Sequence, residues 1–204
     1  MRLKLTGIGA LAASIALVMA ACSSQTEPAR DVATTPTTSA SACVVGEPGP
    51  GGGTIFYRDA ATGLCFEAAP SGWNGGGSDP SLAWGTTNKC ASISIATGTA
   101  IGDGEANTTA ITRNTACDTP KKAPAAWAAK NYAGGGRSDW FLPSKDELNQ
   151  LYAQKTTVGG FAGVLVWSSS QNGASYAWWQ NLGAGGQISD YKGLTLRVRP
   201  VRAF

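Results

Sequence analysis

The sequence predicts an α+β domain of short antiparallel strands, two or three helices and long loops, stapled by disulfides. Three observations support this fold class. Glycine is abundant, with 27 residues, and only 14% of the residues are charged. The apolar runs are short and separated by glycine-rich stretches, as in small sheets. Four cysteines follow an export signal, and disulfides persist in exported proteins.

Two apolar runs, Thr54–Tyr57 and Leu64–Ala68, flank six residues that include Gly63. This spacing predicts a β-hairpin. Towards the end of the chain, residues 164–168, 176–182 and 194–201 have strand character. We expect them to form a three-stranded sheet, most simply an antiparallel one.

Helices are predicted at three places. Ser144 and Glu147 have the spacing of a capping box, with apolar residues at helical spacing behind them. The alanine-rich residues 124–132 precede three glycines that would end a helix. Asn107 is expected to cap a further short helix.

The first 21 residues have the parts of a bacterial secretory signal. A basic start is followed by an apolar run and by Ala20 and Ala21, directly before Cys22. Cysteine after such a cut predicts a lipoprotein with lipid on Cys22, at the cell membrane or outer envelope and facing away from the cytoplasm. The alternative is a short transmembrane anchor, since the run has the minimum length for one.

Residues 22–42 are mostly Ser, Thr, Ala, Pro and charged, with few large apolar side chains. Such a stretch cannot bury enough apolar surface to offset the entropy of ordering it. We expect a flexible stalk there and a single domain over residues 43–204.

Cys43, Cys65, Cys90 and Cys117 allow three disulfide pairings. Pairing Cys43 with Cys65 and Cys90 with Cys117 is favoured because each pair closes a loop of moderate length. Zinc is the alternative, but the chain has no histidine and no C-x-x-C spacing.

Charge does not point to a nucleic-acid partner. Without Arg2 and Lys4 the 16 basic residues become 14, against 13 acidic ones, which leaves a net charge of about +1. Arg197, Arg199 and Arg202 alternate loosely with valines, and this pattern predicts the solvent face of a last strand.

Several blocks of the chain resemble one known family. They are Gly51–Tyr57, Glu67–Pro70, Ser138–Leu148, Val166–Ser170 and Arg197–Arg202. Together they are similar to the Lcl carboxy-terminal-type domain, over about residues 49–204. The resemblance implies a fold like those of the formylglycine-generating enzymes and the C-type lectins, and an activity of binding, since the namesake is a collagen-like adhesin that attaches to sulfated glycans. The namesake's collagen-like repeat is missing here.

Catalysis is not predicted, and neither is a cofactor or a metal. The chain has no histidine for a hydrolytic triad, and it lacks the late cysteine pair of the formylglycine-generating enzymes. Helix capping accounts for Asp139, Asp146 and Glu147. Asp103, Glu105 and Asn107 alternate as calcium ligands can, but the full pattern is absent.

Tryptophan faces suit sugar rings, so the Trp178–Trp179 pair invites a binding hypothesis. Strand alternation places the two on opposite faces. We expect Trp178 beside Leu182 in the core, and Trp179 with Asn181 on a loop surface. Hydrogen-bonding partners for a ligand are expected in the flanking loops, at Asn172, Gln187, Asp190 and Lys192.

The sequence therefore predicts a lipid-anchored surface protein with a non-catalytic binding or adhesion domain. Its expected partners are the membrane, through the lipid, and an extracellular glycan or surface protein. The alternatives are a structural envelope protein that organises protein partners and an enzyme of unrecognised type.

Overall fold

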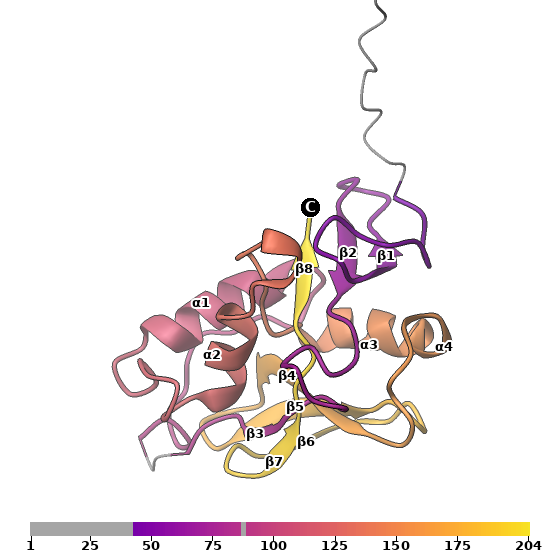
Figure 1. The fold of residues 1–204 in the computed structure, drawn as a ribbon. Coiled ribbons are helices and arrows are strands. Elements are labelled where there is room, and N and C mark those ends of the chain that lie inside the picture. Colours follow the sequence, from indigo (N-terminus) through magenta and orange to yellow (C-terminus); the bar gives the residue numbers. More distant parts are fainter. Residues whose placement is uncertain (1–42, 87–88) are drawn as a thin grey trace, which may run out of the picture. The chain divides into compact units, whose positions relative to one another are not determined.

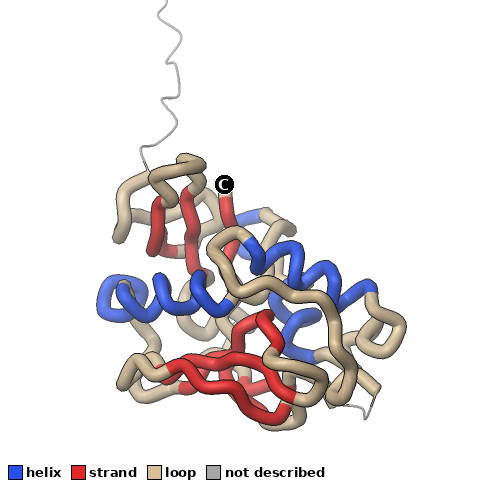
Figure 2. Tube along the Cα trace, turned by 180° about the vertical axis from the view of Figure 1, so that it is seen from behind, coloured by secondary structure: helices blue, strands red, loops and turns tan. Residues whose placement is uncertain are grey.

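Residues 43–86 and 89–204 are described by the computed structural model. The predicted signal, the stalk and Cys22 therefore lie outside the described residues. Within those residues, no helix is both long and apolar enough to cross a membrane. The described residues form an α+β structure with two separate sheets and the helices between them in both views (Figures 1 and 2).

The predicted hairpin is confirmed. Strands β1 (Thr54–Arg58) and β2 (Cys65–Ala68) pair antiparallel, and the last strand of the chain, β8 (Val201–Ala203), pairs antiparallel with β2. Asp59 organises the hairpin loop, because its carboxylate accepts hydrogen bonds from the Ala61 amide and the Thr62 hydroxyl. The two ends of the described domain thus meet in one three-stranded sheet.

Residues 43–86 and 89–204 contain four α-helices, more than the two or three expected, together with one short 3-10 helix. The capping box is confirmed: the Ser144 hydroxyl accepts from the Glu147 amide, and the Glu147 carboxylate accepts from the Ser144 amide. The helix bounds are Asp103–Arg113 (α1), Pro124–Lys130 (α2), Lys145–Ala153 (α3), Lys155–Val158 (α4) and Gly134–Gly136 (η1).

The expected cap at Asn107 is wrong. The helix begins earlier, with Gly102 as N-cap, and Asn107 lies inside α1. Its amide group is buried and bonds the backbone of Gly98 in both directions, and it also donates to the Ser169 hydroxyl. Asn107 therefore ties α1 to a neighbouring loop and to a strand.

The three-stranded tail sheet is also corrected. The large sheet has five strands in the order β3-β7-β4-β5-β6, and β7 runs parallel to β4. The stretch expected to be one last strand is interrupted before Pro200, so that β7 joins the large sheet and β8 the small one. Proline cannot donate to a strand ladder, which explains the break. The remaining bounds are Ser81–Ala83 (β3), Leu165–Gln171 (β4), Tyr176–Asn181 (β5), Gln187–Tyr191 (β6) and Thr195–Arg197 (β7).

Each face of the large sheet packs against its own hydrophobic cluster. Val166 on β4 belongs to a cluster that includes α3 and the β1–β2 hairpin. The next residue, Trp167, points to the other side and joins a cluster with α1 and α2. The alternation of side chains along a strand thus divides the core into two halves.

Tryptophans hold loops in place through their indole N–H groups. Trp167 donates to the Leu82 carbonyl at 3.0 Å, Trp84 to the Ser168 carbonyl at 3.0 Å and Trp73 to the Val198 carbonyl at 2.8 Å. Buried tryptophan is stable when its N–H finds such an acceptor. Much of the tryptophan in this chain is therefore structural.

The expectation that Arg197, Arg199 and Arg202 form a solvent face is wrong for Arg199 and Arg202, while Arg197 is half-buried. Arg199 is fully buried, and its Nε donates to Asp79 Oδ2 at 2.6 Å. Arg202 is also buried and bonds two carboxylates, at 2.7 Å to Glu67 and at 2.7 and 2.8 Å to Asp139. Burial of these cations is possible because each has an anionic partner.

The predicted disulfide pairing is confirmed. Cys43 bonds Cys65 and so attaches the start of the described domain to β2, and Cys90 bonds Cys117. The Cα atoms of the two pairs lie 6.0 and 5.1 Å apart, within the usual range.

Arg199→Met should destabilise the domain by about 3–5 kcal/mol, because it leaves the Asp79 carboxylate buried without its cation. Replacing both partners, as in Arg199→Met with Asp79→Leu, should recover much of this loss. Denaturant unfolding followed by tryptophan fluorescence measures both. Arg58→Met, at an exposed position, is the control and should change stability by no more than ~0.5 kcal/mol. A loss below about 1 kcal/mol for Arg199→Met would show that the pair is not needed.

Candidate functional site

Exposed apolar side chains concentrate on the β5–β6 hairpin and the turn that follows it. Of the seven large hydrophobic residues exposed in the described part of the chain, four lie here: Tyr176 (50% exposed), Ile188 (54%), Tyr191 (44%) and Leu194 (42%). The other three, Val44, Val45 and Leu64, lie near the start of the domain and in the β1–β2 loop. The hairpin is therefore the main apolar surface of the described residues.

Two tyrosines form the centre of this surface. Tyr176 on β5 lies directly opposite Tyr191 on β6 in the strand register. Directly opposed side chains on an antiparallel pair lie within contact distance on the same face. We call Tyr176, Tyr191 and their neighbour Trp178 the tyrosine surface.

Trp178 forms the inner end of the tyrosine surface. It lies two residues along β5 from Tyr176 and so shares its face. The Lys145 ammonium, from the first turn of α3, lies 4.6 Å from the centroid of the Trp178 ring. This cation–π contact places one positive charge beside the aromatic groups.

Polar groups border the tyrosine surface and hold the hairpin against α3. Asn172 donates from its amide to the Ser189 hydroxyl at 2.8 Å, in an exposed position. Gln187 donates to the Lys145 carbonyl at 2.7 Å and to Gln180 Oε1 at 3.2 Å. Gln187 was expected in a loop, but it begins β6 and has a structural role there.

The expected arrangement of the two tryptophans is wrong. Trp179 is only partly exposed and packs against the core cluster that contains Trp167, its opposite residue on β4. Its indole nitrogen is buried and has no hydrogen-bond partner among the described residues. Trp178, expected in the core, is instead the one beside the surface tyrosines. The assignment was reversed because the core cluster with Trp167 lies on the Trp179 side of β5, whereas Lys145 at the start of α3 lies over Trp178 on the other side.

Asn181 and Asp190 are engaged in local backbone contacts. Asn181 Oδ1 accepts from the amides of Gly183 and Ala184 and so shapes the turn between β5 and β6. Asp190 was expected in a loop but lies on β6, where its carboxylate accepts from the Tyr191 amide at 2.7 Å. Ala177, the residue opposite Asp190, shares the face of Trp179, so Asp190 lies on the reverse side of the hairpin from the tyrosines.

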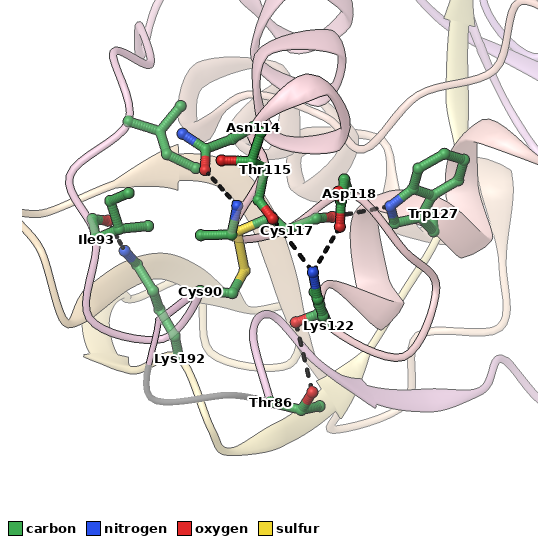
Figure 3. The surroundings of a disulfide bond; sticks show 12 residues. Thr86, Cys90, Ile93, Asn114, Thr115, Cys117, Asp118, Lys122, Trp127 and Lys192 are labelled. Atoms are coloured by element: carbon green, nitrogen blue, oxygen red, sulfur yellow. Dashed lines mark hydrogen bonds and ion pairs between the residues drawn. A yellow bond between two sulfur atoms is a disulfide. The ribbon is translucent and has the colours of Figure 1, made fainter.

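Lys192 is not a surface residue. It is fully buried next to the Cys90–Cys117 disulfide, and its ammonium donates to the Ile93 carbonyl (Figure 3). The same ammonium donates to the Ala174 carbonyl. The ammonium also lies 4.7 Å from the centroid of the Trp84 ring. Burial away from water lowers the pKa of Lys192 to about 8. Lys192 therefore has a structural role and is not accessible to an external ligand.

The carboxylates considered for catalysis are held in structural contacts. The Glu147 carboxylate is buried and accepts from the amides of Ser144, Gly102 and Gly104, so it joins the N-termini of α1 and α3. Burial raises its pKa above the usual value. Asp139 does not belong to a helix start as expected, and its hydrogen bonds to Arg202 lower its pKa.

Hollows occur elsewhere on the domain. One of about 340 Å³ is lined by Phe161, Leu182 and the glycines around them. A smaller one of about 60 Å³ lies between α1 and the segment 138–141. Neither includes the tyrosine surface. Among the residues described, no group of three or more His, Cys, Asp or Glu side chains could hold a metal ion.

Sequence reasoning missed Tyr176, Tyr191 and Lys145. The glycine-rich residues 183–186 between two short runs are a hairpin signal and could have revealed β6. The pairing of the tyrosines depends on strand register, and the position of Lys145 depends on how α3 packs on β5, so neither could be read from local pattern.

The lowered pKa of Lys192 predicts a pH dependence of stability. Below its usual pKa of 10.5 the unfolded chain holds this proton, while the folded protein begins to release it near pH 8. The unfolded state then binds more protons, so folding stability should rise as pH increases from about 8 towards 10. Unfolding free energies of Lys192→Met over this range should lack that rise. Lys121→Met, at an exposed lysine, is the matched control, and an equal rise in Lys192→Met would contradict the assignment.

Comparison with known proteins places these features in a family. No curated protein matches the chain at a significant level. A family model described as the Lcl C-terminal domain matches residues 58–202, from the end of β1 to β8. The match includes the tyrosine surface and both buried arginine pairs, and it covers more than half of the chain. The chain therefore belongs to the Lcl C-terminal domain family.

Proposed function

We propose that this protein is a lipid-anchored surface lipoprotein whose domain binds an extracellular glycan through the tyrosine surface, without catalysis. The observation that carries the proposal is the opposed pair Tyr176 and Tyr191, each about half exposed on the β5–β6 hairpin. Aromatic side chains offer flat apolar area with a polar tip, and they lose little conformational entropy when they bind. The family is named after an adhesin, which is consistent with a binding role.

The position of the hairpin supports display at a surface. The described chain begins at Cys43, which the disulfide to Cys65 holds at the small sheet. The small sheet and the β5–β6 hairpin lie at opposite ends of the domain (Figures 1 and 2). A tether that precedes Cys43 would thus attach at the small sheet, away from the β5–β6 hairpin. The lipid on Cys22 and the stalk over residues 22–42 are part of the proposal and rest on the sequence.

A binding role without catalysis is supported by the use of the ionisable groups. The chain has no histidine. Glu67, Asp79 and Glu147 are buried and bonded to arginine or to backbone amides. An acid or base that must exchange protons with a substrate needs to reach it. These three carboxylates face their structural partners instead.

The fold is part of the same proposal. The domain carries long loops on short strands, is stapled by two disulfides and closes its ends in one small sheet. These features are in keeping with the resemblance to C-type-lectin-like and formylglycine-generating-enzyme-like folds. We include that relationship as an inference about architecture, and no sugar-binding residues are taken from it.

Tyr176→Ala combined with Tyr191→Ala should weaken glycan binding roughly tenfold or more, because two stacking rings contribute about 1–3 kcal/mol. The secreted Cys22→Ser protein, applied to a broad glycan array and then titrated with its best ligand, measures this loss. Leu64→Ala removes an exposed apolar residue from the other end of the domain and should bind as the parent does. No retained glycan on the array, or equal binding by the double variant, would refute the tyrosine surface as a glycan site.

Radiolabelled palmitate should be incorporated into the parent protein and not into Cys22→Ser, because a lipobox cysteine carries the acyl chains. Membrane fractionation should show the same contrast, since stable anchoring takes two chains on that cysteine. Cys43→Ser is the matched control, because Cys43 is held in a disulfide. Equal labelling of the parent and of Cys22→Ser would overturn the anchor.

A further inference from the structure

Sheet edges need protection, because unpaired backbone groups are a template for another strand. Three of the four edges in the described structure have it. The outer side of β1 is bonded by Gly46 and Glu47, and that of β8 by Phe141. The third edge strand, β3, has only three residues and follows Pro80. Short edge strands and proline both discourage strand addition.

The fourth edge, β6, has no such protection within the described residues. It has five residues, contains neither lysine nor proline, and pairs with β5 in an unbroken register without a bulge. The sheet order leaves its outer side without a neighbouring strand. β6 is therefore the one described edge that keeps a regular, uncovered backbone.

The hydrogen bonds at both ends of the hairpin show which backbone groups face outward. The Lys192 amide donates to the Ser175 carbonyl, and the Asn181 amide donates to the Gly186 carbonyl. Bonded and non-bonded pairs alternate along an antiparallel ladder. Ile188 and Asp190 thus bond inward to β5, while the N–H and C=O groups of Gln187 and Ser189 point away from the sheet.

The row of unpaired, outward-pointing backbone groups on β6 ends at Tyr191. Its amide donates to the Asp190 carboxylate, and its carbonyl accepts from the Leu194 amide. The open stretch is thus limited to Gln187–Ser189 and its immediate surroundings. Ile188 on one face and Tyr191 on the other flank it with exposed apolar side chains.

We propose that the outer edge of β6 binds an extended segment of a partner protein as a sixth strand, with an apolar residue opposite Ile188 and a basic residue opposite Asp190. Backbone hydrogen bonds to Gln187 and Ser189 would supply the affinity. The partner side chains opposite Ile188 and Asp190 would supply the selectivity. The proposal goes beyond the glycan site, since it uses the strand edge and the face that carries Ile188.

Charge favours a basic partner over a second copy of this chain. Asp190 is the only charged residue of β6, and no cation of the described residues pairs with it. When two copies of β6 pair antiparallel through Gln187 and Ser189, Asp190 lies opposite Ala184, Gly186 or Ile188. None of these arrangements gives the carboxylate a cation. A lysine or arginine in a partner strand does.

The test uses the secreted Cys22→Ser protein and a labelled peptide, Thr-Lys-Thr-Val-Thr-Lys-Thr with blocked ends. Its central valine can face Ile188 with a lysine beside Asp190 in either strand direction. In the free protein the amides of Gln187 and Ser189 should exchange with solvent much faster than those of Ile188 and Asp190. Saturating peptide should slow both fast amides at least tenfold, as measured by hydrogen exchange with NMR detection.

Variants separate strand addition from other binding. Ser189→Pro removes an outward amide and keeps the inward bonds, so it should lower peptide affinity at least tenfold in fluorescence anisotropy. Ser189→Ala loses only the hydroxyl that accepts from Asn172 and should stay within twofold. Asp190→Asn should weaken the lysine peptide several-fold, but not the same peptide with methionine in place of lysine. Tyr176→Ala should leave peptide binding unchanged, which distinguishes this site from the glycan site.

Three results would overturn the proposal. One is the absence of binding by both the lysine and the methionine peptides. Another is slow exchange of Gln187 and Ser189 in the free monomer, which would mean that this chain already covers the edge. The last is protection that appears only as the protein self-associates with rising concentration, which would identify a second copy as the occupant.

Discussion

The buried arginine pairs are the constraint on which the rest of the structure depends. Arg202 reaches Glu67 and Asp139 at once, and the Glu67 carboxylate also accepts from the amides of Gly51 and Gly53. A Cβ atom on Gly49 would lie 2.0 Å from this carboxylate, and one on Gly51 2.5 Å. The glycine-rich start of the domain is thus explained by the close approach of a loop to one buried anion.

The segment that carries these arginines connects the two sheets. Their burial also means that the basic residues near the end of the chain do not form a positively charged surface. Arg197 ends β7 in the large sheet, and Arg202 lies on β8 in the small one, with Arg199 between them bonded to Asp79. Because Arg199 and Arg202 are neutralised inside the domain, the basic end of the chain does not form a polyanion surface. The aromatic hairpin remains the main exposed apolar surface of the described residues.

Structural and exposed aromatic residues are separated by element. Trp73, Trp84 and Trp167 donate to backbone carbonyls far away in the sequence and so fix long loops. Tyr176 and Tyr191 lie instead opposite each other on the β5–β6 hairpin, with about half of each side chain exposed. The indole bonds thus connect the segment around β3 to β4 and to the residues after β7, while the exposed tyrosines belong to the β5–β6 hairpin.

Local chemistry in the sequence determined the parts of this protein that depend on near neighbours: the first hairpin, the capping box at Ser144 and Glu147, and the two disulfides. It could not place groups whose partners are distant. Arg199 and Lys192 looked solvated because Asp79 and the Ile93 carbonyl are 120 and 99 residues away. The faces of Trp178 and Trp179 were decided by which helix and which cluster cover β5. Tertiary packing alone decides burial, because the exposure of a side chain to solvent depends on elements that are distant in the sequence.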